Sequence, residues 1–244
     1  MNAQQLFENG QLSDAIASLS AELRTNPTDV IRRTFLFELL CFAGAYDRAE
    51  RQLDVLRDAS HEAEMGTLLY RSAVAAERKR SAMFEQGSFP ASTTPLTAVT
   101  GTLNGRRFST LVDADPRIGP RLELFVAGQY MWLPMQHVAS VTIGEPRRLR
   151  DLIWMQAHVT PSPKLAGLEL GEVLMPALTP LAWQHQDESV RLGRVSDWVR
   201  LDSGAEVPAG QKLLIMDDEE IPILEVRDLQ IDSPATSESG DDAR

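Results

Sequence analysis

The sequence of 244 residues predicts an α+β protein, in which an N-terminal α-helical array is followed by a β-rich C-terminal domain. Apolar residues recur at helical spacing up to about residue 86, a stretch rich in Gly, Pro, Ser and Thr follows, and short runs with alternating apolar residues come after it. We therefore expect a helical domain over 1–88, a linker over 89–98, a β-rich domain over 99–231 and a disordered acidic tail over 232–244.

A repeat near the start of the chain indicates the kind of helical array. Four residues recur 34 positions later: Gly10, Leu12, Ala15 and Leu19 return as Gly44, Tyr46, Ala49 and Leu53. This period and this pattern of small and large residues are typical of tetratricopeptide helix pairs. Such pairs stack and leave a concave surface for a partner, so the repeat predicts a protein that holds another protein.

Five helices account for the apolar spacing up to residue 86. The first covers 3–9, the second follows an N-cap at Ser13, the third covers 29–42 after an N-cap at Thr28, and two more cover 46–56 and 61–86. Only two copies of the repeat are visible, whereas about three stacked units are needed for stability. The long fifth helix or the next domain must supply the missing packing surface.

The second half of the chain has the pattern of short strands. Leu122 and Leu124 alternate with Arg121 and Glu123, which predicts a strand with one apolar face. Residues 127–129 predict a hairpin turn after this strand, and the acidic residues 217–220 predict a solvated turn between two apolar strands. Residues 150–159 fit either a helix or a strand.

Composition narrows the classes of partner. The net charge is −11 and the isoelectric point is near 4.9, so the surface repels phosphate backbones and anionic lipids. The apolar runs are too short to span a bilayer, and no secretory leader pattern opens the chain. A single cysteine, Cys41, allows no internal disulfide, which fits a reducing compartment. We expect a cytoplasmic protein that binds neither nucleic acid nor membrane.

Side chains that could carry chemistry are few. Asp113 and Asp115 could form a carboxylate pair for acid–base or metal chemistry, but aspartate next to Pro116 is ordinary in turns. The four histidines are scattered without metal-ligand spacing, and no phosphate-binding loop or nucleophile motif is present. We expect no catalytic residue, no metal site and no cofactor.

Aromatic and charged residues are the candidates for partner binding in the second half. Tryptophan is usually core or interface mass, and Trp183 lies in a polar segment where it could be an exposed anchor. Arg194, Asp197 and Trp198 form a second group. They either fix loops through internal ion pairs or recognise a partner.

The third predicted helix supplies the other candidates. Its apolar residues point in different directions, so some must face the second domain or a partner. Phe37 could line a groove for an amphipathic helix or belong to the core. Arg32 and Arg33 could hold acidic residues that flank the partner's apolar stripe.

A series of unusual sequence motifs in the second half resembles that of a known family. The motifs are DADPRIGPRLELFVAGQYMWLP at 113–134, PRRLRDLIWMQAHV at 146–159, LMPALTP at 174–180, VRLGRVSDW at 190–198 and EEIPILEVRDLQI at 219–231. Together with the helical N-terminus, their order resembles the ImpE/SciE family, also called TagJ, whose members are virulence-associated accessory proteins of type VI secretion systems.

The resemblance implies a cytoplasmic, non-enzymatic adaptor. Such an adaptor binds the small subunit of the contractile sheath, through a helix near that subunit's N-terminus. Through this subunit it is linked to the AAA+ unfoldase that recycles contracted sheath. Two alternatives remain open from the residues themselves: a general peptide-binding cochaperone with helical repeats, and an enzyme that uses the acidic motifs of the second domain.

Overall fold

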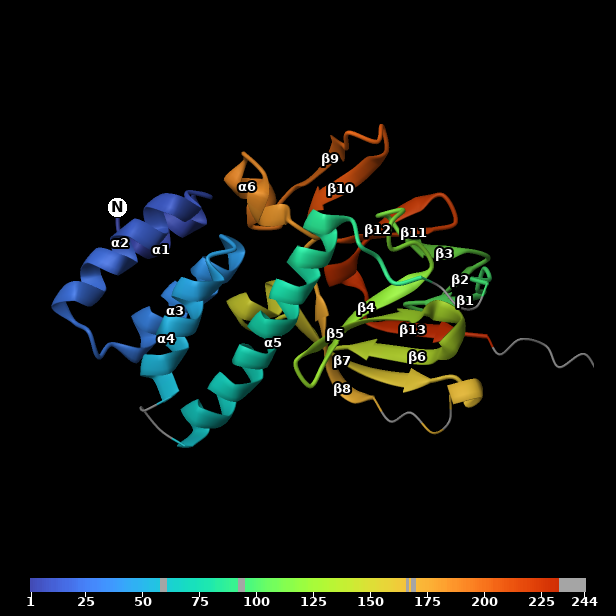
Figure 1. The fold of residues 1–244 in the computed structure, drawn as a ribbon, viewed down its shortest axis with the longest axis horizontal. Coiled ribbons are helices and arrows are strands. Elements are labelled where there is room, and N and C mark those ends of the chain that lie inside the picture. Colours follow the sequence, from blue (N-terminus) through green and yellow to red (C-terminus); the bar gives the residue numbers. More distant parts are fainter. Residues whose placement is uncertain (58–60, 92–94, 166, 168–169, 233–244) are drawn as a thin grey trace, which may run out of the picture.

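The fold, in a computed structural model, is α+β, as the sequence predicts. Residues 1–57, 61–91, 95–165, 167 and 170–232 are described. Figure 1 shows five helices on one side, a β-sheet on the other, and α5 lying between the remaining helices and the sheet. Residues 92–94 of the predicted linker lie outside the described residues, and so does the predicted tail apart from Asp232.

The helices pack in chain order, each against the next. They are α1 (Ala3–Glu8), α2 (Leu12–Thr25), α3 (Val30–Phe42), α4 (Tyr46–Arg57) and α5 (His61–Gln86). The predicted caps of α2 and α3 are wrong. Asp29 caps α3 by accepting from the backbone N–H of Arg32 at 2.9 Å. Ser13 lies inside α2, and its backbone N–H donates instead to Glu188 at 3.1 Å.

The two repeat copies occupy equivalent places in the helical array. Gly10 follows α1 with φ +80° and Gly44 follows α3 with φ +66°, a conformation that favours glycine at the end of a helix. Ala15 and Ala49 are both fully buried where neighbouring helices pack. Whether this array is a true tetratricopeptide stack stays a prediction.

An eight-stranded antiparallel sheet forms most of the second half, in the order β2-β1-β13-β6-β7-β8-β4-β5. Its strands are β1 (Gly101–Leu103), β2 (Arg106–Phe108), β4 (Arg121–Val126), β5 (Gln129–Pro134), β6 (Val138–Ile143), β7 (Trp154–Pro161), β8 (Gly171–Pro176) and β13 (Asp228–Ile231). The last strand along the chain, β13, lies between β1 and β6, so the sheet joins segments far apart in the sequence.

Two smaller sheets and short helices complete the fold. A three-stranded sheet contains β12 (Glu219–Pro222), β11 (Leu213–Met216) and β3 (Leu111–Asp113), and a hairpin contains β9 (Ser196–Arg200) and β10 (Glu206–Gly210). The short helices are α6 (Glu188–Arg191) and five 3-10 turns, η1 (Met135–His137), η2 (Leu149–Leu152), η3 (Pro163–Leu165), η4 (Ala182–Gln184) and η5 (Ile223–Glu225).

Both predicted turns are present but shorter than predicted, because Gln129 belongs to β5 and Glu219 and Glu220 belong to β12. Ala127 and Gly128 join β4 to β5 with φ +48° and +76°, the positive values that tight hairpins require. Asp217 and Asp218 join β11 to β12. The segment left open, 150–159, begins within η2 and continues as β7 from Trp154.

The sheet contributes to a core on each of its two faces, because successive side chains of a strand point to opposite faces. Leu122 and Leu124 of β4 face one core, which the strands share among themselves, whereas Phe125 faces the core shared with the helices. The helix-side core also includes several residues of the second half: Ile153, Trp154, Leu174, Leu178, Ala182 and Leu192. The second half therefore supplies packing surface to the helices. The exact domain boundary stays a prediction.

Candidate functional site

The predicted residues of α3 divide between core and surface. Phe37 is 1% exposed and packs against Tyr70 and Trp154, with ring centroids 5.9 and 6.4 Å away, so it belongs to the core. Arg32 is exposed and pairs with Glu22 at 2.8 Å and with Asp29. Arg33 donates to Gln52 of α4 at 2.8 Å and to the carbonyl of Pro27. Both arginines thus make contacts within the helical array.

Trp183 packs within the molecule and is not a freely exposed anchor. It is half-buried, and a Cβ placed on Gly44 would lie 2.4 Å from its ring. The absent side chain of Gly44 therefore makes room for the indole of Trp183 at the turn between α3 and α4. Sequence reasoning missed this contact because the two residues are distant in the chain.

Arg194 also makes internal contacts, whereas Trp198 remains exposed. The Arg194 guanidinium lies 4.8 Å from the centre of the Phe7 ring and donates to the carbonyls of Phe7 and Glu8 at 2.6 and 2.8 Å, at the C-terminal end of α1. Asp197 lies 3.3 Å from Nε2 of His185. Trp198, on β9, is 42% exposed.

A buried ionic network, which the sequence did not indicate, joins α5 to the sheet. Arg80 of α5 donates to both oxygens of Glu123 of β4, at 2.8 and 2.9 Å, and to Glu77 at 2.9 Å. Lys212 donates to Glu123 at 2.6 Å and pairs with Asp113 of β3. These five side chains are all buried, so the network pairs its charges away from solvent.

The surroundings of the two carboxylates on the sheet strands, Glu123 and Asp113, shift their pKa values in opposite directions. Burial acts to raise the pKa of Glu123, but the charges and hydrogen bonds of Arg80 and Lys212 outweigh it and lower this pKa to about 2. Burial raises the pKa of Asp113 to about 6, although the charge of Lys212 opposes the rise. Glu123 is therefore the anion that both cations share.

The second member of the predicted carboxylate pair makes turn contacts. Asp115 accepts from the backbone N–H of Arg117 at 3.0 Å and from its guanidinium at 2.9 Å. Asp113 Oδ1 accepts from the backbone N–H of Asp115 at 2.9 Å. Within the described residues, no group of three or more His, Cys, Asp or Glu side chains is placed to hold a metal ion.

An exposed apolar stripe runs along the first half of α5. It consists of three exposed apolar residues, Met65, Leu68 and Leu69, and the half-buried Ser72, which lie at spacings i, i+3, i+4 and i+7 and therefore on one face of the helix. Leu68 is 55% exposed, and Met65 and Leu69 are exposed as well. We call these four residues the α5 stripe.

Among the helices that the structure describes, none is long and apolar enough to cross a membrane.

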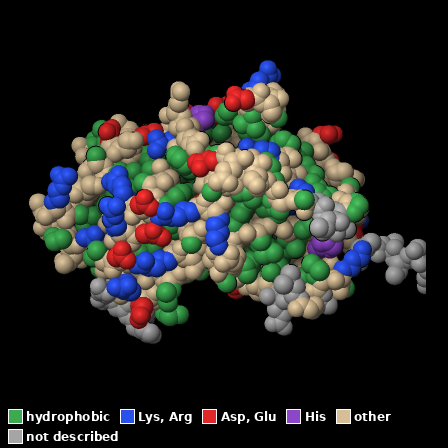
Figure 2. All heavy atoms as spheres, viewed as in Figure 1, with side chains coloured by type: hydrophobic (Ala, Val, Ile, Leu, Met, Phe, Trp, Pro, Cys, Tyr) green, Lys and Arg blue, Asp and Glu red, His purple; other side chains and the backbone are tan. Residues whose placement is uncertain are grey.

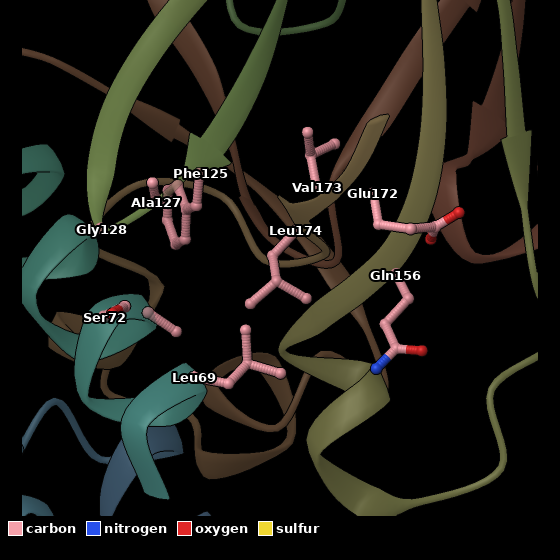
Figure 3. A pocket seen from close by; sticks show the side chains of 10 residues that line it. Leu69, Ser72, Phe125, Ala127, Gly128, Gln156, Glu172, Val173 and Leu174 are labelled. Carbon is pink, nitrogen blue, oxygen red and sulfur yellow. The ribbon is translucent and has the colours of Figure 1, made fainter. Parts of the chain in front are cut away.

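A groove opens beside the α5 stripe, between α5 and the sheet. Its volume is about 300 Å³. Figure 3 shows Leu69 and Ser72 of α5 facing it from one side, and Phe125 of β4 and Leu174 of β8 from the other. We call it the α5–β4 groove. Because its walls are mainly apolar, it can take apolar side chains of a partner that rests on the stripe.

A second groove, of about 310 Å³, lies on the α3 side of α5. Val30 and Thr34 of α3 and Gly66 of α5 line it, and Arg150 lies over the ring of Tyr70 at 4.7 Å. Figure 2 shows basic and acidic side chains interspersed over the helical half of the molecule. Phe37 also lines this groove, so one of the three α3 candidates lies at its wall although its side chain belongs to the core.

Comparisons with known proteins agree over nearly the whole chain. The family model described as ImpE protein matches residues 105–230. The chain is 32% identical over 265 aligned positions to the "Type VI secretion system accessory component TagJ" of Pseudomonas aeruginosa, covering 95% of this chain and 92% of that protein. A crystal structure of a Vibrio parahaemolyticus protein superposes with a TM-score of 0.84 at 23% identity, covering 96% of this chain and 98% of that one. The last likeness concerns the fold alone.

Proposed function

The chain belongs to the ImpE family, and on that premise we propose that it is a cytoplasmic, non-enzymatic accessory protein of a type VI secretion system. The observation that carries this proposal is the 32% identity over 95% of the chain to a protein of that description. Similarity over both the helices and the sheet supports the same role for both parts of the chain, because the aligned region includes 95% of it.

The role that we propose in detail is that of an adaptor for the sheath. The protein binds the small sheath subunit through a helix near that subunit's N-terminus, and it thereby links the sheath to the AAA+ unfoldase that recycles it. In this proposal the ionic network has a structural role, because Arg80 and Glu123 pair with each other in the interior.

The α5 stripe is our proposed docking site for the partner helix. A helix that rests on another helix buries apolar anchors at helical spacing, and the apolar residues Met65, Leu68 and Leu69 have the spacing i, i+3 and i+4. The α5–β4 groove next to Leu69 would receive the apolar side chains that point past the stripe. The competing location is the α3-side groove, near the predicted candidates Arg32 and Arg33.

The test is a titration of a fluorescent peptide that covers the N-terminal helix of the small sheath subunit. We expect Leu68→Asp to weaken binding about tenfold or more, because it places a charge in an apolar contact. Val55→Asp is the matched control, since Val55 is 47% exposed on α4 and receives the same new charge. Circular dichroism checks that both variants are folded.

Three other outcomes of the titration would change the proposed role, the class of protein or the docking site. If the wild-type protein does not bind the peptide, the adaptor role is wrong. If a scrambled peptide of the same composition binds equally well, the general cochaperone is the better description. If Leu68→Asp binds normally and Arg33→Glu does not, the function stands and the site moves to the α3 side.

A further inference from the structure

The β9–β10 hairpin projects from the body of the molecule, away from the α5 stripe (Figure 1). Four of the five residues of β9 are exposed. Among them are the apolar side chains of Trp198 and Val199, and Val195, just before the strand, is exposed too. Large exposed apolar side chains gathered on one short element are typical of an interaction surface.

The outer edge of β9 offers unused backbone groups. Leu201 N–H donates to the carbonyl of Ala205 at 2.8 Å, so these residues form a hydrogen-bonded pair. Bonded and non-bonded pairs alternate along an antiparallel ladder, and this places Trp198–Pro208 and Arg200–Glu206 among the non-bonded pairs. The backbone groups of Ser196, Trp198 and Arg200 therefore point outward.

Most of these outward groups have no partner in the part of the chain that the structure describes. The exception is the N–H of Trp198, which donates to the side chain of Asp197 at 2.8 Å. The N–H groups of Ser196 and Arg200 and the carbonyls of all three outward residues make no hydrogen bond to any of the described residues. A strand edge in this state can pair with another strand.

The edge of β10, by contrast, is closed. Pro208 has no N–H to donate, and it faces outward in the non-bonded pair with Trp198. The carbonyl of Gly210 accepts from the N–H of Thr179 at 2.9 Å, and the N–H of Gly210 donates to Oγ1 of Thr179 at 2.9 Å. The hairpin thus has one edge that resists pairing and one that permits it.

One face of the hairpin borders the largest groove described, about 590 Å³ in volume. Asp197, Val199 and Leu201 line it from the β9 side, since alternate residues share one face of a strand. The opposite wall includes Leu181, whose φ of +61° is unusual for a branched side chain. A strand added to β9 would lay every second side chain over this groove.

We infer that the open edge of β9 is a second docking site, for an extended and basic segment of a partner protein. Backbone pairing selects a strand and not a helix, because only an extended chain presents its N–H and C=O groups along an edge. The groove residues Val199 and Leu201 require apolar side chains opposite them. The carboxylate of Asp197, which is 58% exposed, and the net charge of −11 favour a basic residue at the remaining groove position.

A second copy of this chain fits the edge less well. Two copies of β9 paired around a twofold axis keep residues of one face together, so a pairing centred on Trp198 sets each Asp197 against the apolar Val199. Pairing also brings together two chains that each carry a net charge of −11. The inference does not depend on the helix site, because the hairpin and the α5 stripe are separate surfaces.

The experiment uses the full chain and a fluorescein-labelled peptide of alternating threonine and valine with a lysine at each end. We expect the peptide to bind wild type, and binding to fall about tenfold or more when the amides that face β9 are N-methylated. Arg200→Pro should cause a similar loss, because it removes an outward donor of β9. Glu206→Pro is the matched control, since it removes an outward donor of β10 and breaks the same Arg200–Glu206 ion pair of 3.0 Å.

Val199→Asp gives a test that leaves the backbone intact, and it should also weaken binding. Circular dichroism establishes that each variant is folded. No binding to wild type, or equal loss in Arg200→Pro and Glu206→Pro, overturns the inference. A dimer of wild type in light scattering that Arg200→Pro dissociates also overturns it, because the edge would then be a contact between two copies.

Discussion

At the scale of single residues, Glu38 is a buried carboxylate whose titration makes the stability of the protein depend on pH. It lies on α3 and is 8% exposed. Burial raises its pKa from 4.5 to about 7; the charges of Arg150 and Arg148 oppose this rise, and that of Asp151 adds to it. Between pH 4.5 and 7 the folded state binds more protons than the unfolded state, so stability falls as the pH rises through this window.

Glu38→Gln should therefore stabilise the protein at high pH. A shift of this size corresponds to about 3 kcal/mol of unfolding free energy above pH 7, and the neutral amide avoids that cost. We expect the gain in urea denaturation to be largest at pH 8 and small at pH 5. Glu220→Gln is the matched control, since it removes the same charge from an exposed position on β12. An equal gain in unfolding free energy at both pH values would mean that Glu38 does not change its charge between pH 5 and pH 8 in the folded protein.

At the scale of elements, the sequence predicted those features that depend on residues close in sequence and missed those that depend on distant residues. The helices and the turns at 127–128 and 217–218 depend on residues close in sequence, so their patterns were sufficient. The contact of Trp183 with Gly44 and the position of β13 between β1 and β6 depend on distant segments. No local pattern encodes such pairs.

The buried small residues of the repeat give a prediction for the helices. Ala15 of α2 is fully buried where helices pack, and Ala17, two residues along the same helix, is exposed. Ala15→Leu should lower the unfolding free energy by about 1–3 kcal/mol through overpacking. Ala17→Leu adds the same atoms to the surface and should change stability little. Thermal melts of both variants measure this, and equal tolerance would mean that α2 does not pack closely at Ala15.

At the scale of the whole molecule, the ionic network and the shared core join the two halves, so we expect them to unfold as one unit. Arg80 belongs to the helical half, while Glu123 and Lys212 lie 43 and 132 positions further along the chain. The sequence could not indicate this network, because its members look like ordinary surface charges when each is considered alone. Their burial is decided only when α5 meets the sheet.

Arg80→Met should therefore destabilise the entire protein. It leaves Glu77 without its ion pair and Glu123 with Lys212 alone, and breaking a buried pair costs about 3–5 kcal/mol. Arg78→Met is the matched control, since Arg78 is 39% exposed and pairs with Asp47 and Glu50 at 2.7 Å on the surface. Its cost should be about 0–1 kcal/mol.

Urea denaturation at pH 7 measures both losses, and fluorescence and circular dichroism should report one shared transition. A loss for Arg80→Met no larger than that for Arg78→Met would mean that the network contributes no net stability. Separate transitions for the helical and sheet signals would mean that the two halves unfold independently.

The central position of β13 has a consequence for synthesis on the ribosome. The helices are complete once Gln86 has been made, but β1 and β6 have no partner between them until residues 228–231 emerge. That is about 140 residues later, or roughly 7 to 30 seconds at the usual rate of translation. Phe37 lacks its contact with Trp154 until residue 154 has been made, 68 residues after Gln86. During this interval the apolar face of the array is open to chaperones and to other nascent chains.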